Sequence, residues 1–213
     1  FRRVLFRSEL SIALHRCFET PKDKFVWDVS HQVYVHKILT GRKDRFRTIR
    51  TTNGLNGFAL RTESEHDCYG AGHAGTALSA ALGMCAARDQ RAGPEHVVCI
   101  FGDAALTNGI SFEALNNIAH TTKRFIGILN DNEWSIAKNV GAIADYLNRI
   151  VTHPKYQAVH SKWESFLKRL GPEIAKAEHK FEEAFKSVLV PSVLFEEFGL
   201  RYLGPMDGHN LPK

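Results

Sequence analysis

The chain has 213 residues, of which 44% are hydrophobic and 24% charged, a composition typical of a globular protein with one sizeable core. No apolar stretch is long enough to cross a membrane, and the four cysteines lack a CxxC spacing, which argues against membrane-spanning and disulfide-rich proteins and favours reduced thiols in the cytoplasm. The net charge is +5, but Arg2, Arg3 and Arg7 all lie at the extreme N-terminus, so the charge does not indicate a nucleic-acid partner.

Residues 1–8 form a basic segment that matches the translation of a common sequencing-adapter oligonucleotide. We interpret them as a cloning or assembly artefact and exclude them from the fold prediction. A short basic targeting arm is the alternative. Residues 9–213 are then expected to be part of a single domain whose natural start lies upstream.

Helix and strand signals alternate in the first forty residues. Apolar residues at helical spacing predict a helix over 10–18 with Cys17 on its core-facing side, and the apolar run 25–29 predicts the first strand. A second helix is predicted to start at Ser30. His31 would then lie at the carboxyl end of the strand, either as a buried cap or as a group that faces a ligand.

A long polar segment follows, at residues 41–73, rich in glycine, arginine and threonine. A connection of this length is usually either functional or disordered. Its end overlaps the glycine-rich run 69–76, which leads into a predicted apolar helix over 77–87. Glycines before a helix let backbone N–H groups approach an anion, although close packing by small residues would explain the same pattern.

The clearest signal is a β-α-β unit, with buried strands at 97–101 and 125–129 and an amphipathic helix at 111–119 between them. Because both strands are expected to be parallel, Asp103 and Asn132 should lie at the same edge of the sheet. A carboxylate and a carboxamide favour Mg²⁺, which usually shares its site with phosphates. Helix capping by the aspartate and a turn at the asparagine are the alternative.

The C-terminal part is predicted to contain four helices, one at residues 142–150, two within 155–190 and one at 193–198. A last strand is predicted at residues 200–203. Asp207 and His209 follow in a loop, where they either face the ligand edge or fix the turn. The fold class predicted from these elements is α/β, a doubly wound parallel sheet with helices on both faces, incomplete at both ends.

Several motifs resemble the family of 1-deoxy-D-xylulose-5-phosphate synthases within the transketolase superfamily, namely Trp27–Gln32, Gly102–Gly109, Phe112–Asn117 and Ile128–Glu133. The similarity extends over nearly all of residues 9–213. It implies a bound thiamine diphosphate and a Mg²⁺ ion. The implied metal ligands are the side chains of Asp103 and Asn132 and the backbone carbonyl of Trp134.

The same resemblance implies a set of cofactor-binding residues, which are His31, Gly72, His73, Ala74, Ala104, Ala105 and Asn132. The chain departs from the family pattern at three positions, because Ser30 and Ala104 replace glycines and Ala74 replaces a serine. The methyl group of Ala104 could crowd the diphosphate. Ala74 removes one hydroxyl contact, so these changes bear on cofactor affinity.

The resemblance implies an enzyme that condenses pyruvate with glyceraldehyde 3-phosphate and releases CO₂, in a cytoplasmic homodimer without nucleic-acid or membrane partners. Family members use a glutamate from a second domain to activate the cofactor, and no catalytic residue is assigned in this chain. The chain alone is therefore expected to be inactive. The alternatives are ketol transfer of the transketolase type and a non-catalytic module that binds a magnesium diphosphate.

Overall fold

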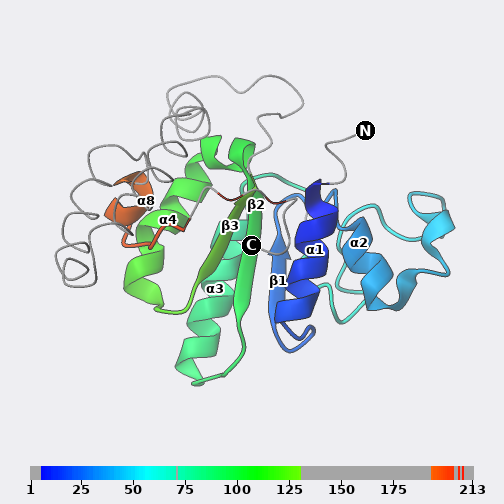
Figure 1. Cartoon of the computed structure of the whole chain (residues 1–213), viewed down its shortest axis with the longest axis horizontal. Helices are drawn as coiled ribbons and strands as arrows, with labels where there is room; N and C mark the ends of the chain where they lie inside the picture. Colours follow the sequence, from blue (N-terminus) through cyan, green and yellow to red (C-terminus); the bar gives the residue numbers. More distant parts are fainter. Residues whose placement is uncertain (1–5, 71, 131–192, 204–205, 207, 209–213) are drawn as a thin grey trace, which may run out of the picture. The chain divides into compact units, whose positions relative to one another are not determined.

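The computed structural model describes residues 6–70, 72–130, 193–203, 206 and 208 (Figure 1). It separates into two compact units, one of residues 1–139 with 206–213 and one of residues 140–205. The predicted helices between residues 142 and 190 lie outside the described residues, as do Asn132, Trp134, Asp207 and His209.

Three parallel strands in the order β1-β2-β3 form the sheet of the first unit. They are β1 (Lys24–Trp27), β2 (Val97–Gly102) and β3 (Ile126–Asn130), and each pairs in parallel with its neighbour. Residues 97–101 of β2 are all buried, as expected for a strand covered on both faces. The predicted parallel α/β sheet is confirmed.

Helices cover both faces of this sheet. Leu14 of α1 (Phe6–Cys17) packs into one cluster with Phe25 and Trp27 of β1. Side chains alternate along a strand, so the neighbouring buried residues of β1 and β2 point to the opposite face. There α3 (Ala77–Gln90) and α4 (Gly109–Thr121) pack against each other, and α3 also packs against β2 (Figure 1).

The chain after β1 differs from the prediction. Val29 and Ser30 have φ angles of 56° and 63°, so the strand stops at Trp27 and the chain turns sharply. No helix begins at Ser30. The helix α2 covers only Tyr34–Lys37 and continues into a π-helical turn, η1 (Ile38–Arg42), whose Gly41 has a φ angle of 86°.

Two further expectations were wrong. Cys17 is exposed, because the core-facing side of α1 at this end is occupied by Leu14 and the partly buried Phe18. Residues 200–203 do not form a strand in the second unit. That unit contains α8 (Val193–Glu197), whose buried Phe195 stacks on Tyr202 with ring centroids 5.8 Å apart.

The polar segment 41–73 is irregular, with one short 3-10 turn, η2 (Phe46–Thr48). Leu55 and Ala59 are buried in this segment, together with the charged side chains of Arg42 and Asp67. No helix among the described residues is both long and apolar enough to span a membrane.

Candidate functional site

The carboxyl ends of the three strands lie at one edge of the sheet. In the observed register Trp27 pairs with Ile100, and Gly102 pairs with Asn130. Asp28 and Asp103 directly follow β1 and β2. Parallel α/β sheets bind ligands outside this edge, because loops rather than strands cover it.

Asp28 joins the glycine-rich turn to the end of β1. Its two carboxylate oxygens accept hydrogen bonds from the backbone N–H of Gly75, at 2.9 and 3.0 Å. Gly75 has a φ angle of 84°, and a Cβ atom there would lie 2.8 Å from the side chain of Asn108. This position therefore requires glycine for both its conformation and its close approach.

Ser111, in the first turn of α4, joins the same turn to the end of β2. Its hydroxyl contacts the carbonyl oxygen of Ala105 at 2.7 Å and that of Gly75 at 3.3 Å. Asp103 and Ala105 belong to the short 3-10 helix η3 (Asp103–Thr107) that leads from β2 into α4. The ends of β1 and β2 and the turn before α3 are thus connected through Gly75.

The structure brings most of the described predicted residues to this edge. The turn residues Gly72, His73 and Ala74 are exposed and directly precede Gly75. His31 is also exposed and follows the end of β1. Asp103 and Ala105 are buried at the end of β2, with Ala104 half-buried between them.

Backbone strain marks the end of β1. A positive φ angle is unusual for any residue other than glycine and is a genuine outlier for a β-branched residue such as Val29. Such strain tends to occur at functional sites. The positive φ angle of Ser30 explains why the family pattern has a glycine at this position. The serine hydroxyl accepts a hydrogen bond from the N–H of Ala59 at 3.0 Å, a contact that glycine cannot make.

Asn130 is a further candidate site residue, which was not predicted from the sequence. Its side chain is 3% exposed at the end of β3, and neither amide atom has a hydrogen-bond partner among the described residues. Buried amides are normally paired, so this one indicates that a polar group belongs nearby. Asn130 could have been found as the first asparagine of the Leu129–Asn132 motif.

These residues fit a magnesium diphosphate. Asp103 provides a carboxylate that is only 5% exposed, and residues 72–74 are exposed before α3. Asn130 provides a buried amide that has no hydrogen-bond partner among the described residues. No group of three histidine, cysteine, aspartate or glutamate residues within the described ranges could hold a metal ion. The predicted ligand set is of another kind, since it combines one carboxylate with a carboxamide and a backbone carbonyl.

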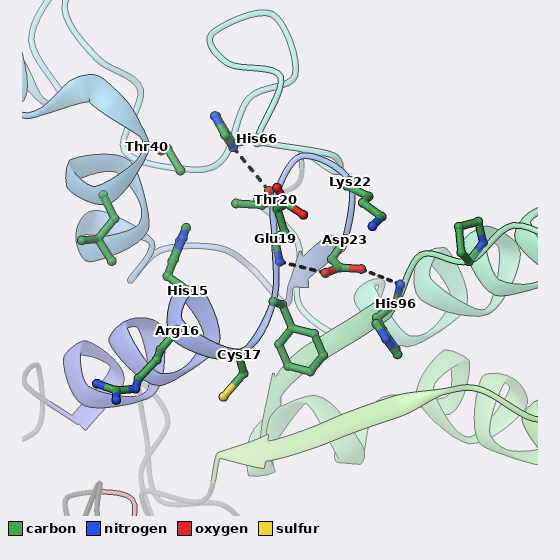
Figure 2. Close-up of a pocket in the computed structure, with 13 residues that line it drawn as sticks. His15, Arg16, Cys17, Glu19, Thr20, Lys22, Asp23, Thr40, His66 and His96 are labelled. Carbon is green, nitrogen blue, oxygen red and sulfur yellow. Dashed lines mark hydrogen bonds between the residues drawn. The ribbon is translucent and has the colours of Figure 1, made fainter.

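A hollow of about 610 Å³ lies at the opposite, amino edge of the sheet (Figure 2). Its lining includes the end of α1, the loop before β1, His66 and His96, and Figure 2 shows the labelled side chains of His15, Asp23 and His96 around it. Asp23 accepts hydrogen bonds there from the backbone N–H groups of Glu19 and His96. This hollow contains none of the predicted site residues, and no sequence motif indicated it.

The thiols of Cys68, Cys85 and Cys99 are poorly suited to nucleophilic chemistry. Burial raises the pKa of Cys68 to about 11, and it also raises the pKa values of Cys85 and Cys99. All four cysteines are free. Cys17 is a surface residue.

Comparison with known proteins indicates the family. The family model described as 1-deoxy-D-xylulose-5-phosphate synthase matches residues 4–213. The chain is 62% identical over 206 residues to the 1-deoxy-D-xylulose-5-phosphate synthase of Methylacidiphilum infernorum, which covers 96% of this chain and 33% of that protein. It is 65% identical over 204 residues to the 1-deoxy-D-xylulose-5-phosphate synthase of Acidobacterium capsulatum, and this match covers 95% of the chain and 32% of that protein.

Among solved structures, a transketolase mutant from Pichia stipitis is similar to the chain with a TM-score of 0.56 and 19% identity. This similarity covers 60% of the chain and 23% of the transketolase, and it supports the fold alone. The chain spans about a third of the length of the curated relatives it matches.

Proposed function

Since the chain belongs to the 1-deoxy-D-xylulose-5-phosphate synthase family, we propose that it forms the diphosphate- and magnesium-binding part of an enzyme that condenses pyruvate with glyceraldehyde 3-phosphate. The reaction releases CO₂ and yields 1-deoxy-D-xylulose 5-phosphate, a precursor for isoprenoids, thiamine and pyridoxal. Bound thiamine diphosphate supplies the nucleophilic carbon and the electron sink for this decarboxylation.

The arrangement around Gly75 is the observation that carries this proposal. Three loops that a cofactor diphosphate would contact are tied together there. The loop after β2 carries the buried carboxylate of Asp103, and the end of β3 carries the buried amide of Asn130, which has no hydrogen-bond partner among the described residues. In this proposal the side chains of Asp103 and Asn132 and the carbonyl of Trp134 hold Mg²⁺. The metal and the helix N-terminus together offset the charge of the diphosphate.

The remaining predicted residues bind and orient the cofactor. The backbone of residues 72–74, together with Ala104 and Ala105, would contact it. His31 donates a hydrogen bond or moves a proton near neutral pH, which imidazole can do because its ordinary pKa is close to 7. The departures at Ala104 and Ala74 bear on how tightly the cofactor binds and leave the identity of the site unchanged.

In this proposal the complete enzyme is a homodimer and is located in the cytoplasm. The four free cysteines support a reducing compartment. The glutamate that activates the cofactor lies in a part of the enzyme beyond the third of the relatives' length that this chain spans.

The test is a product assay on the full-length enzyme that contains this chain. With Mg²⁺ and thiamine diphosphate it should convert pyruvate and glyceraldehyde 3-phosphate into 1-deoxy-D-xylulose 5-phosphate. Transfer of a ketol group between sugar phosphates instead would support a transketolase. Calorimetric titration with thiamine diphosphate against ATP distinguishes the enzyme from a general diphosphate-binding module, which should not prefer thiamine.

A further inference from the structure

A buried group of charged side chains holds the irregular segment 41–73. We call it the Asp67 cluster, and it consists of His36, Lys37, Arg42, Glu63 and Asp67. Its two carboxylates face one lysine and one arginine, so the formal charges balance. Lys37 and His36 are fully buried. Full burial is rare for lysine and indicates that the charge of Lys37 is paired.

Asp67 is the centre of this cluster. Arg42 donates to both of its carboxylate oxygens, at 2.7 and 2.8 Å, and His36 donates its Nε2 proton at 3.2 Å. Burial alone would raise the pKa of Asp67, but these hydrogen bonds outweigh it and hold the pKa well below its usual range. The carboxylate therefore stays ionised and accepts from a fixed set of donors.

Glu63 extends the cluster along the segment. It accepts from Arg42 at 3.0 Å, from the backbone N–H of Asn56 at 2.7 Å, and from Lys37. The cluster thus joins α2 and η1 to two separate stretches of the irregular segment. A buried ion pair contributes little net stability because of its desolvation cost, so its stronger effect here is to select one path for the chain.

That path leads to the ligand edge. Asp67 accepts from the N–H of Leu60 at 2.9 Å, and the preceding N–H, that of Ala59, donates to Ser30 at 3.0 Å. Two hydrogen bonds, made by the adjacent residues Ala59 and Leu60, therefore link the strained turn before His31 to the cluster. A Cβ atom on Gly72 would lie 3.8 Å from the ring of Phe58, so the glycine-rich turn packs against the same stretch.

We propose that the Asp67 cluster is a positioning device, which places the Ser30–His31 turn and the Gly72–Ala74 turn for the cofactor. This inference rests on the proposed function. It assigns the cluster no contact with the cofactor and no part in the reaction. Loss of the cluster geometry should weaken cofactor binding much more than it slows the reaction of cofactor-loaded enzyme.

The test compares two buried arginines in the full-length enzyme. Arg42→Lys keeps the positive charge but loses the two-pronged contact with Asp67. Arg88→Lys is the matched control, because Arg88 is also fully buried and donates to Asp89, Thr122 and the carbonyl of Arg124, away from the turns at residues 30–31 and 72–74.

For Arg42→Lys we expect a dissociation constant for thiamine diphosphate with Mg²⁺ about tenfold above wild type, as is common for residues that support a binding site. The kcat at saturating cofactor should stay within about twofold. Amide hydrogen exchange at residues 58–75 of the cofactor-free enzyme should be faster. Arg88→Lys should lower thermal stability and leave the dissociation constant and this exchange unchanged.

Wild-type cofactor affinity and wild-type exchange in Arg42→Lys would overturn the proposal, as would an equal loss of affinity in Arg88→Lys. If Arg42→Lys does not fold, Glu63→Gln takes its place, since the amide oxygen can still accept from Asn56. A wild-type enzyme that binds no thiamine diphosphate would refute the proposed function instead. The exchange experiment on cofactor-free enzyme would then still decide whether the cluster positions the two turns.

Discussion

Replacing Gly75 with alanine should strongly destabilise the turn at the ligand edge. Gly75 has a φ angle of 84°, where an L-residue with a Cβ atom is strained by about 1–2 kcal/mol. The new methyl group would also lie 2.8 Å from both Cβ and Nδ2 of Asn108, closer than such atoms pack. Forcing a methyl group into a filled space typically costs about 1–3 kcal/mol more.

The two contributions together predict a loss of roughly 2–5 kcal/mol in the free energy of unfolding. Urea denaturation of the chain, followed by tryptophan fluorescence to which the buried Trp27 contributes, measures this loss. At a slope of roughly 2–3 kcal/mol per molar urea, the midpoint should fall by roughly 1–2 M. The double variant Gly75→Ala/Asn108→Gly should recover the steric part and keep the conformational part.

Gly83→Ala is the matched control, because Gly83 lies inside α3 and a Cβ atom there would have nothing within 4 Å. It should stabilise the chain by about 0.5–1 kcal/mol, as expected for alanine in place of glycine in a helix. An unchanged or higher midpoint for Gly75→Ala would refute the reasoning. Equal effects of the two substitutions would refute it as well.

Four further results are expected. In the full-length enzyme, Asp103→Ala should abolish Mg²⁺-dependent binding of thiamine diphosphate and Asn132→Ala should weaken it, and wild-type affinity of the Asp103 variant in calorimetry would disprove the metal assignment. Asn130→Leu should leave the urea midpoint unchanged or raise it, because the buried amide has no described hydrogen bond to lose, yet it should weaken cofactor binding. The chain alone should form no product from pyruvate and glyceraldehyde 3-phosphate, whereas its fusion to the remaining two thirds of the Acidobacterium capsulatum relative should be active. Product from the chain alone would mean that the chain contains the activating glutamate. Burial lowers the pKa of His15 from 6.5 to about 4, so between these pH values the unfolded chain binds a proton that the folded chain does not. The free energy of unfolding should therefore decrease as the pH drops from 6.5 to 4, and it should decrease less steeply in His15→Gln.

Short apolar runs made the sheet predictable. The predicted strands correspond to β2, whose residues 97–101 are buried as expected, and to β3, which is only partly buried, contrary to the expectation. The helix between them is α4. Such elements can be recognised because their hydrophobic residues recur with the period of a strand or a helix, which depends only on residues close in the sequence. The region after Trp27 was predicted less well, since the left-handed conformation of Val29 and Ser30 replaces the expected continuation of strand and helix.

Part of the arrangement at the ligand edge was predictable in the same way. Asp103 could be identified because it comes directly after the end of a buried strand. The parallel order of β2 and β3 could be inferred from the helix that connects them. Gly75 could be recognised as part of a glycine-rich turn, but its bond to Asp28, 47 residues away, could not. The unpaired amide of Asn130 likewise became visible only when its surroundings were known.

The sequence by itself determined the three strands of the sheet, the helices α3 and α4 and the motif residues at the strand ends, because local periodicity encodes these features. Only the tertiary structure decided how segment 41–73 is held. Arg42 and Asp67 are 25 residues apart, and Asp67 bonds to His36 across 31 residues. These contacts leave no periodic pattern, because a charge can be buried only where folding brings its partner to the same place.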